Sequence, residues 1–199
     1  MMQSFKPRSS TSGFTLIEIL VIIIIIAVLS AIAAPGWLAF MNNRRISTAR
    51  SQIADTIRKA QNDAKTTRTM RAVLLEENNN SPRIGIVRCN PATSGDTNSC
   101  DTTGPNVDWL TLGQGDIRPG TLSYTSTTKA QTNAGQIRLV FDENGAVRKN
   151  LSGWSAANGF VVGLTLNAQQ NPKTPRCLVV QTLLGSLREG NNASECGAP

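Results

Sequence analysis

The sequence predicts an α+β protein in which a long N-terminal α-helix, half of it transmembrane, packs on an antiparallel β-sheet or a two-sheet sandwich. Three observations predict this class. Residues 14–34 form an almost continuous apolar run, residues 46–64 repeat with a helical period, and the period changes to two from Arg71 onward. A helix followed by a run of strands is typical of an α+β domain.

The apolar run is long enough to cross a membrane. It contains one ionisable residue, Glu18, and about 20 apolar residues in a helix span the hydrocarbon core. We therefore expect residues 14–36 to form the transmembrane half of the helix. Pro35 is expected to bend it, because proline removes a backbone hydrogen bond.

A secretory signal peptide is the main alternative for this segment. Lys6 and Arg8 would supply the positive region, Ile19–Leu29 the apolar region, and Ala31–Ala33 a small-residue cleavage site. This interpretation does not explain Glu18. A lone charge within a span costs about 2.5 to 3.5 kcal/mol on insertion scales, so Glu18 needs a neutralising partner.

Residues 37–68 are predicted to continue the helix as an amphipathic half. The apolar stripe has steps of three and four residues, and charged residues occupy the other face. The stripe consists of Ile46, Ala49, Ile53, Ile57, Ala60 and Ala64, and the charged face of Arg50, Asp55, Arg58, Lys59 and Asp63.

Residues 69–199 are predicted to form a β-rich globular domain. Asn144 and Gly145 lie between strand-like flanks and predict a hairpin, and Gly185 predicts another tight turn. The strand-like segments are RAVLLEE, RIGIVRC, VDWLTL, QIRLVFD, GFVVGLTL and CLVVQTL.

The cysteines predict disulfides in an oxidising compartment. All four lie beyond the apolar run, there is no CxxC, and the chain has no histidine, so no metal site is expected. Four cysteines allow three connectivities, of which short loops favour Cys89 with Cys100 and Cys177 with Cys196.

The composition argues against an enzyme. Without histidine there is no Ser-His arrangement, and there is neither metal-ligand spacing nor a Walker-type glycine loop, so no catalytic residue and no cofactor are expected. The formal charge of +7 is compatible with an acidic partner or nucleic acid, but solubility is its ordinary explanation.

The segment SGFTLIEILVIIIII resembles the class III signal of type IV pilins and type II secretion pseudopilins. The resemblance implies a type IV pilin fold and a leader, residues 1–13, that a prepilin peptidase removes after Gly13. It also implies that Phe14 becomes the N-methylated first residue and that Glu18 sets the register of assembly. Pro35 falls where pilins carry a helix-bending proline.

The resemblance also implies a location, which charge counting leaves ambiguous because Arg44 and Arg45 follow the span. A peptidase-type leader and extracytoplasmic cysteines give a single pass through the inner membrane. The N-terminus would be cytoplasmic and the globular domain periplasmic, before incorporation into a pilus or pseudopilus.

The segments IADTIRKAQNDAKTTRTMRAVLL and CLVVQTLLGSLRE resemble the GspH/FimT group, which includes FimU-like minor pilins. This likeness implies a minor, tip-associated pilin that primes pilus assembly, with other minor and major pilins as partners and a possible role in twitching motility. A GspH-type minor pseudopilin of a type II secretion system is the alternative.

DNA uptake, as in some FimT-type pilins, is a further alternative. Those proteins use arginines in a GRxR pattern. Here Gly185 is followed by Ser186, Leu187 and Arg188, so one arginine of the pattern remains, and direct DNA binding is not favoured.

Overall fold

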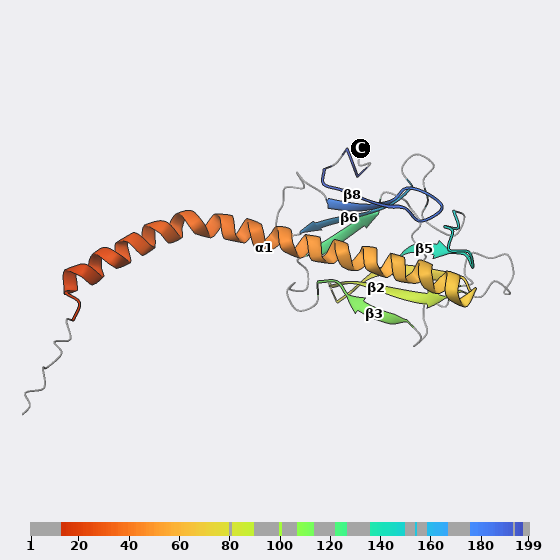
Figure 1. The fold of residues 1–199 in the computed structure, drawn as a ribbon, viewed down its shortest axis with the longest axis horizontal. Coiled ribbons are helices and arrows are strands. Elements are labelled where there is room, and N and C mark those ends of the chain that lie inside the picture. The colour runs from red at the N-terminus through yellow and green to blue at the C-terminus, as the bar shows by residue number, and fades with distance from the viewer. Residues whose placement is uncertain are drawn as a thin grey trace, which may run out of the picture. The chain divides into compact units, whose positions relative to one another are not determined.

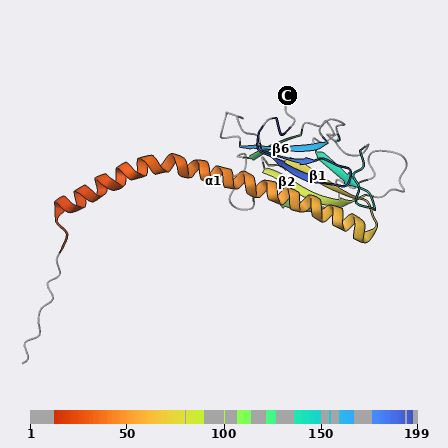
Figure 2. The same ribbon diagram turned by 45° about the horizontal axis from the view of Figure 1, so that its top comes forward.

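The computed structural model contains one long helix and eight strands (Figures 1 and 2). It describes residues 13–79, 81–89, 100, 107–113, 122–126, 136–149, 154, 159–166, 176–192 and 194–196. Lys6 and Arg8 of the predicted leader and the loop 90–106, apart from Cys100, lie outside the described residues. The chain divides into two compact units, Met1–Met41 and Asn42–Pro199.

The helix α1 extends from Leu16 to Thr67 and crosses the boundary between the units. It begins at a capped end, where the Glu18 backbone N–H donates to Thr15 Oγ1 at 3.3 Å. It ends at Thr67, and the next residue, Arg68, has a φ of 51°, the left-handed conformation that commonly terminates helices. The backbone is helical at Pro35; a bend at this residue stays a prediction.

The eight strands form two antiparallel four-stranded sheets. The first sheet has the order β3-β2-β1-β5 and the second β4-β6-β7-β8. The strands are β1 (Arg71–Asn78), β2 (Ser81–Arg88), β3 (Asp108–Thr111), β4 (Leu122–Ser126), β5 (Ile137–Phe141), β6 (Phe160–Leu166), β7 (Arg176–Val180) and β8 (Leu187–Gly190). The α+β class is confirmed, and of the two sheet arrangements left open the structure has two sheets.

The second half of α1 shares one hydrophobic core with both sheets. In the view of Figure 1 it runs between β2 and β3 on one side and β6 and β8 on the other. All six residues of the predicted apolar stripe are buried, as are Phe141 from β5 and Phe160 from β6. Burial of this stripe holds the amphipathic half of the helix on the sheets, at roughly 25 cal/mol per Å² of apolar surface.

Arg50 is a correction to the predicted charged face. It is buried, and its guanidinium donates to Asn191 Oδ1 at 3.0 Å and pairs with Glu189 of β8. The physical reason is its spacing. Arg50 follows Ile46 by four residues and precedes Ile53 by three, so it lies on the same buried face of the helix as these two residues. A buried arginine requires such partners.

The predicted turn at Asn144–Gly145 is present. Gly145 has a φ of 75°, its N–H donates to Asp142 O at 2.8 Å, and the Asp142 N–H donates to Ala146 O at 2.9 Å. The residues after the turn form a single bridge, Phe141 with Val147, rather than a strand. The prediction of a turn is thus confirmed, while the second hairpin strand is reduced to one pair.

Each disulfide lies on the outer face of a sheet. Cys89 is bonded to Cys100 within a small cluster that includes Met70 and Leu74. Cys177 is bonded to Cys196 in a cluster with Val161 and Val179. The pairing is the one that the short loops favour.

Candidate processing and assembly site

The start of α1 brings three of the predicted site residues together. Gly13 and Phe14 precede the helix, Thr15 is its N-cap, and Glu18 lies in its first turn. Thr15 and Glu18 have the T-x-x-E spacing of a capping box, in which the third helical residue is acidic. A carboxylate in the first turn also interacts favourably with the helix dipole. Glu18 therefore has a local reason to be tolerated at the start of an apolar helix.

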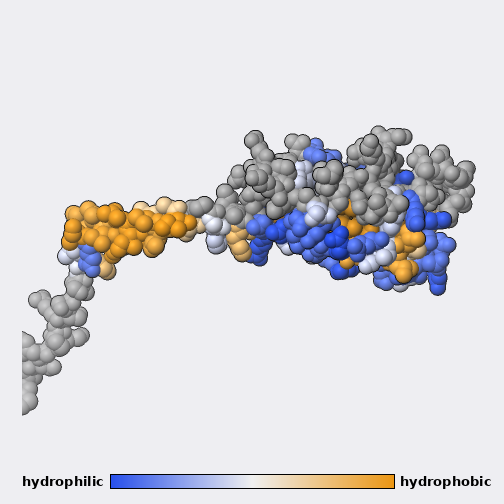
Figure 3. Space-filling model, turned by 90° about the horizontal axis from the view of Figure 1, so that it is seen from above, coloured by the Kyte–Doolittle hydropathy of each residue, from blue (hydrophilic) through white to orange (hydrophobic). Residues whose placement is uncertain are grey.

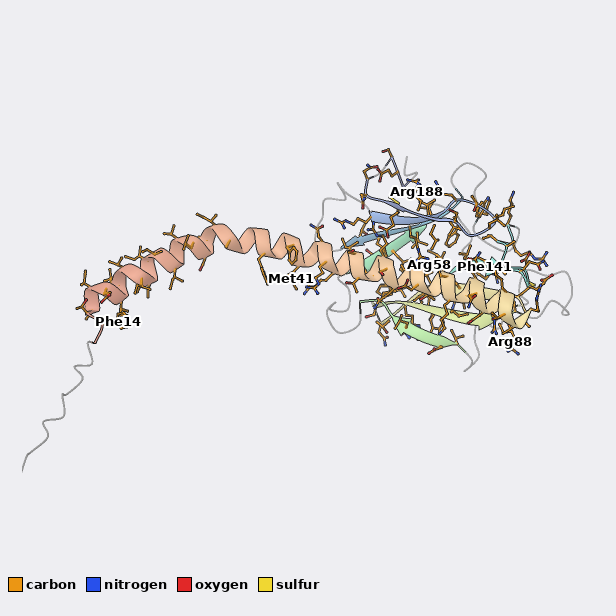
Figure 4. The ribbon with its side chains drawn as sticks, viewed as in Figure 1. Phe14, Met41, Arg58, Arg88, Phe141 and Arg188 are labelled. Carbon is orange, nitrogen blue, oxygen red and sulfur yellow. A yellow bond between two sulfur atoms is a disulfide. The ribbon has the colours of Figure 1, made fainter. Side chains whose placement is uncertain are left out.

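The side chains at this end of the helix are exposed. Phe14 is 73% exposed, and Figure 4 shows it where the helix begins. Glu18 is exposed too, and among the described residues none of the ion pairs involves it. Its carboxylate is thus available to a cation from outside the described residues.

The helix segment that follows is apolar around its circumference. Among the described residues one stretch, Leu16–Ala33, is long and apolar enough to cross a membrane, and none of it is buried. Figure 3 shows apolar side chains covering the visible face of this segment and hydrophilic side chains along the second half of α1. A soluble core helix would be buried, so the exposed run fits either a membrane span or a signal segment.

The remaining predicted residues lie apart from this site. Pro35 is within the helix, seventeen positions beyond Glu18 by residue number, and the four cysteines belong to the unit 42–199. Their disulfides brace the globular unit, and the described residues contain no group of His, Cys, Asp or Glu that could hold a metal ion.

Arg188, the remaining arginine of the GRxR comparison, is engaged within the fold. It lies on β8 (Figure 4), and its guanidinium donates to Glu195 O at 2.7 Å. The Glu195 carboxylate in turn accepts from the Asn191 N–H at 2.7 Å. This arginine therefore fastens the segment that follows β8.

Sequence reasoning missed two polar residues that organise the globular unit, Arg50 and Gln61. Arg50 could have been found from its place on the apolar stripe. Gln61 donates from one amide nitrogen to Gly145 O at 2.8 Å and to Leu184 O at 2.6 Å. These partners lie 84 and 123 residues away, so no local pattern signals them.

Comparison with known proteins supports the assignment of the N-terminal segment. Residues 8–34 match the family described as the prokaryotic N-terminal methylation motif. The sequence matches no curated protein. The structure aligns with that of the minor pseudopilin EpsH from the Type 2 Secretion System of Vibrio cholerae, with 11% identity, a TM-score of 0.46, and coverage of 74% of this chain and 97% of that chain.

The match to residues 8–34 carries the assignment of the N-terminal segment. That range contains Gly13, Phe14 and Glu18. The N-terminal segment of this chain, residues 8–34, therefore carries the prokaryotic N-terminal methylation motif.

Proposed function

We propose that this protein is a membrane-anchored subunit of a type IV pilin-like filament, processed between Gly13 and Phe14. The observation that carries the proposal is the exposed apolar helix with Glu18 in its first turn, inside the matched methylation motif. Such a helix can be held by lipid before assembly and by neighbouring helices afterwards. Its role is structural rather than catalytic.

Processing would give Glu18 its partner. Cleavage after Gly13 creates an ammonium, subsequently N-methylated, on Phe14, four residues before the carboxylate. The two groups could pair within one chain or between adjacent chains, replacing a lone charge in a low-dielectric medium by an ion pair. Pairing between chains would fix the axial register of the helices, as buried polar groups fix register in coiled coils.

Within this class we favour a minor, tip-associated pilin that primes assembly of a type IV pilus. The likeness of the helix-to-β1 segment and of the β7–β8 segment to the GspH/FimT group supports this choice. The partners would be the prepilin peptidase and other minor and major pilins. The chain would pass once through the inner membrane, with its N-terminus cytoplasmic and the disulfide-bonded unit periplasmic.

A minor pseudopilin of a type II secretion system is the second candidate. A minor pilin and a minor pseudopilin would share the signal, the membrane anchor and the sheets. The effect of deleting the gene on piliation and on secretion therefore has to separate them. Deletion of the gene should abolish surface pili and leave secretion intact if the chain belongs to a pilus. The reverse result would assign it to secretion.

The N-terminal residue of the protein purified from membranes of its native host tests the proposal directly. Mass spectrometry of the terminal peptide should find N-methylated Phe14. A chain that begins at Ala34 would instead be the product of an ordinary signal peptidase, and the proposal would be wrong.

A further inference from the structure

The turn between β7 and β8 exposes two adjacent leucines. Leu184 is 80% exposed and Leu183 is 38% exposed. Among the described residues of the unit 42–199, they are the only large apolar side chains that are exposed. A single exposed leucine is ordinary, but two at one turn of an otherwise well-buried unit indicate a contact surface.

The turn is held in a fixed conformation by its own hydrogen bonds. The Gly185 N–H donates to Thr182 O at 2.9 Å, and the Gln181 N–H donates to Ser186 O at 2.9 Å. The Ser186 N–H adds a bond to Thr182 Oγ1 at 3.2 Å. Gly185 has a φ of 80°, which favours glycine. The leucines are therefore presented in an ordered loop, and little conformational entropy remains to be lost on binding.

The turn is also fixed to two other elements. The Val147 N–H donates to Leu183 O at 2.7 Å, and Gln61 of α1 donates to Leu184 O at 2.6 Å. The same Gln61 nitrogen donates to Gly145 O. Both leucine carbonyls are thus bonded to the body of the unit, while both side chains remain exposed.

Basic residues lie on the elements that hold the leucine turn. The Lys65 side chain fills the space that a Cβ on Gly145 would occupy. Arg68 donates to Asn144 Oδ1 at 3.3 Å, and Arg148, which directly follows Val147, donates to Met70 Sδ at 3.9 Å. None of the three cations forms an ion pair with a described carboxylate.

The three cations outnumber the two acidic groups on the neighbouring turn. Asp142 accepts hydrogen bonds from the Asn144 and Ala146 N–H groups, and Glu143 is exposed on the same turn. Lys65 and Arg68 also lie at the C-terminus of α1, where the helix dipole favours cations. The helix dipole does not account for the position of Arg148 or for the exposure of the two leucines.

We propose that the leucine pair and these basic residues, Lys65, Arg68 and Arg148, form a docking site for a protein partner with an apolar pocket bordered by carboxylates. An apolar centre within a polar rim is the usual anatomy of a protein interface. The charge complementarity would orient the partner and speed its association. Two leucines held rigidly at a turn suit a pocket of matching shape.

Photo-crosslinking in the native host tests this site on the full-length chain. With benzoylphenylalanine in place of Leu184, we expect an adduct with one protein. Arg148→Glu and Lys65→Glu together should lower the adduct yield roughly tenfold, the effect of about 1.4 kcal/mol of lost interaction. Replacing the acidic residues around the crosslinked position of that protein by lysine should restore the adduct yield of the charge-reversed variant.

Lys59, exposed on α1, supplies the matched controls. Lys59→Glu should leave the adduct yield unchanged, and the photoreactive residue at position 59 should not give the same adduct. Retention of both disulfides in each variant checks that it is folded. Adducts with lipid or nucleic acid alone, no adduct, or a protein adduct that is insensitive to the charge reversals would each overturn the proposal. Because this docking site does not depend on cleavage at Gly13, its failure is distinct from failure of the proposed function.

Discussion

The guanidinium of Arg50, near the middle of α1, lies 2.5 Å from the carboxylate of Glu189 on β8. Arg50 is buried to 9% side-chain exposure, whereas Glu189 is 55% exposed. The arginine also donates to Asn191, so one side chain of the helix holds the last strand and the segment after it.

Arg50→Ala should destabilise the globular unit. Loss of charged hydrogen bonds from a buried donor costs about 2 kcal/mol of unfolding free energy. Urea unfolding of the full chain in detergent micelles measures this change. Arg58→Ala is the matched control and should cost less than about 1 kcal/mol, because both members of the Arg58–Asp55 ion pair are exposed. Equal effects of the two changes would contradict the central role of Arg50.

Tyr124 is expected to ionise at unusually high pH. Burial, followed by the charges of Glu77 and Glu76, raises its pKa to about 12 from 10.0. A raised pKa in the folded state means that stability is fully present below about pH 10 and is lost as pH rises toward 12. Tyr124 is the single tyrosine, so the ultraviolet absorbance of tyrosinate reports this group alone. If tyrosinate absorbance in the folded chain had its titration midpoint at the ordinary pKa of 10.0, burial would not be raising the pKa of Tyr124. Glu77→Gln should lower this midpoint, because it removes one of the charges that raise the pKa.

Glu18→Ala should block incorporation into filaments without blocking membrane insertion or leader cleavage. The reason is the loss of the carboxylate that would pair with the Phe14 ammonium. The measurement is the amount of the chain in sheared filament fractions relative to membranes. Ile19→Ala, which changes an exposed neighbour without altering charge, is the control. Normal incorporation of the Glu18 variant would count against the pairing mechanism.

Gly13→Leu should leave an uncut precursor. A bulky side chain at the residue before the scissile bond would prevent the peptidase from accepting the backbone, although the helix from Leu16 would still form. Immunoblotting resolves precursor from processed chain. Thr15→Ser, which keeps the capping hydroxyl, should be processed normally. Processing of the Gly13 variant at the usual rate would place the cleavage site elsewhere.

Replacing Cys177 and Cys196 together by serine should lower stability by about 3 kcal/mol, as expected for a loop of this length. The sequence separation of the bonded cysteines is 19, and the loop contains Arg188, Glu189 and Asn191. The measurement is again urea unfolding, with the reduced wild-type chain for comparison. A change below 1 kcal/mol would show that hydrogen bonds alone hold this segment.

Much of the fold could be predicted from the sequence because its long elements have clear periods. The helix stripe from Ile46 to Ala64 and six of the strands follow from the spacing of apolar residues. The turns at Gly145 and Gly185 follow from glycine's tolerance of positive φ.

The strands β4 and β8 could not be predicted in the same way. Their sequences, LSYTS and LREG, are short and mostly polar, and each lies at the edge of its sheet. Pairing with β6 and β7, respectively, makes them strands. Short edge strands depend on such neighbours more than on their own composition.

The residues of the candidate processing site could be named from the sequence because they lie close together in the chain. Gly13, Phe14 and Glu18 belong to one short motif, and their local geometry follows from helix capping. The leucine pair could not be predicted, because exposure of Leu183 and Leu184 depends on where the turn is bonded to Gln61 and Val147.

The hydrogen bonds of Gln61 have a consequence for the order of folding. A ribosome makes α1 first, but Leu184 follows Gln61 by 123 residues. Contacts so distant in sequence close large loops, and this part of the native structure cannot form until the end of the chain has been synthesised. Until then the second sheet, which shares the core with Ile53 and Ile57, lacks its last strand, β8. A chain truncated before residue 184 would therefore be a ready substrate for chaperones and proteases.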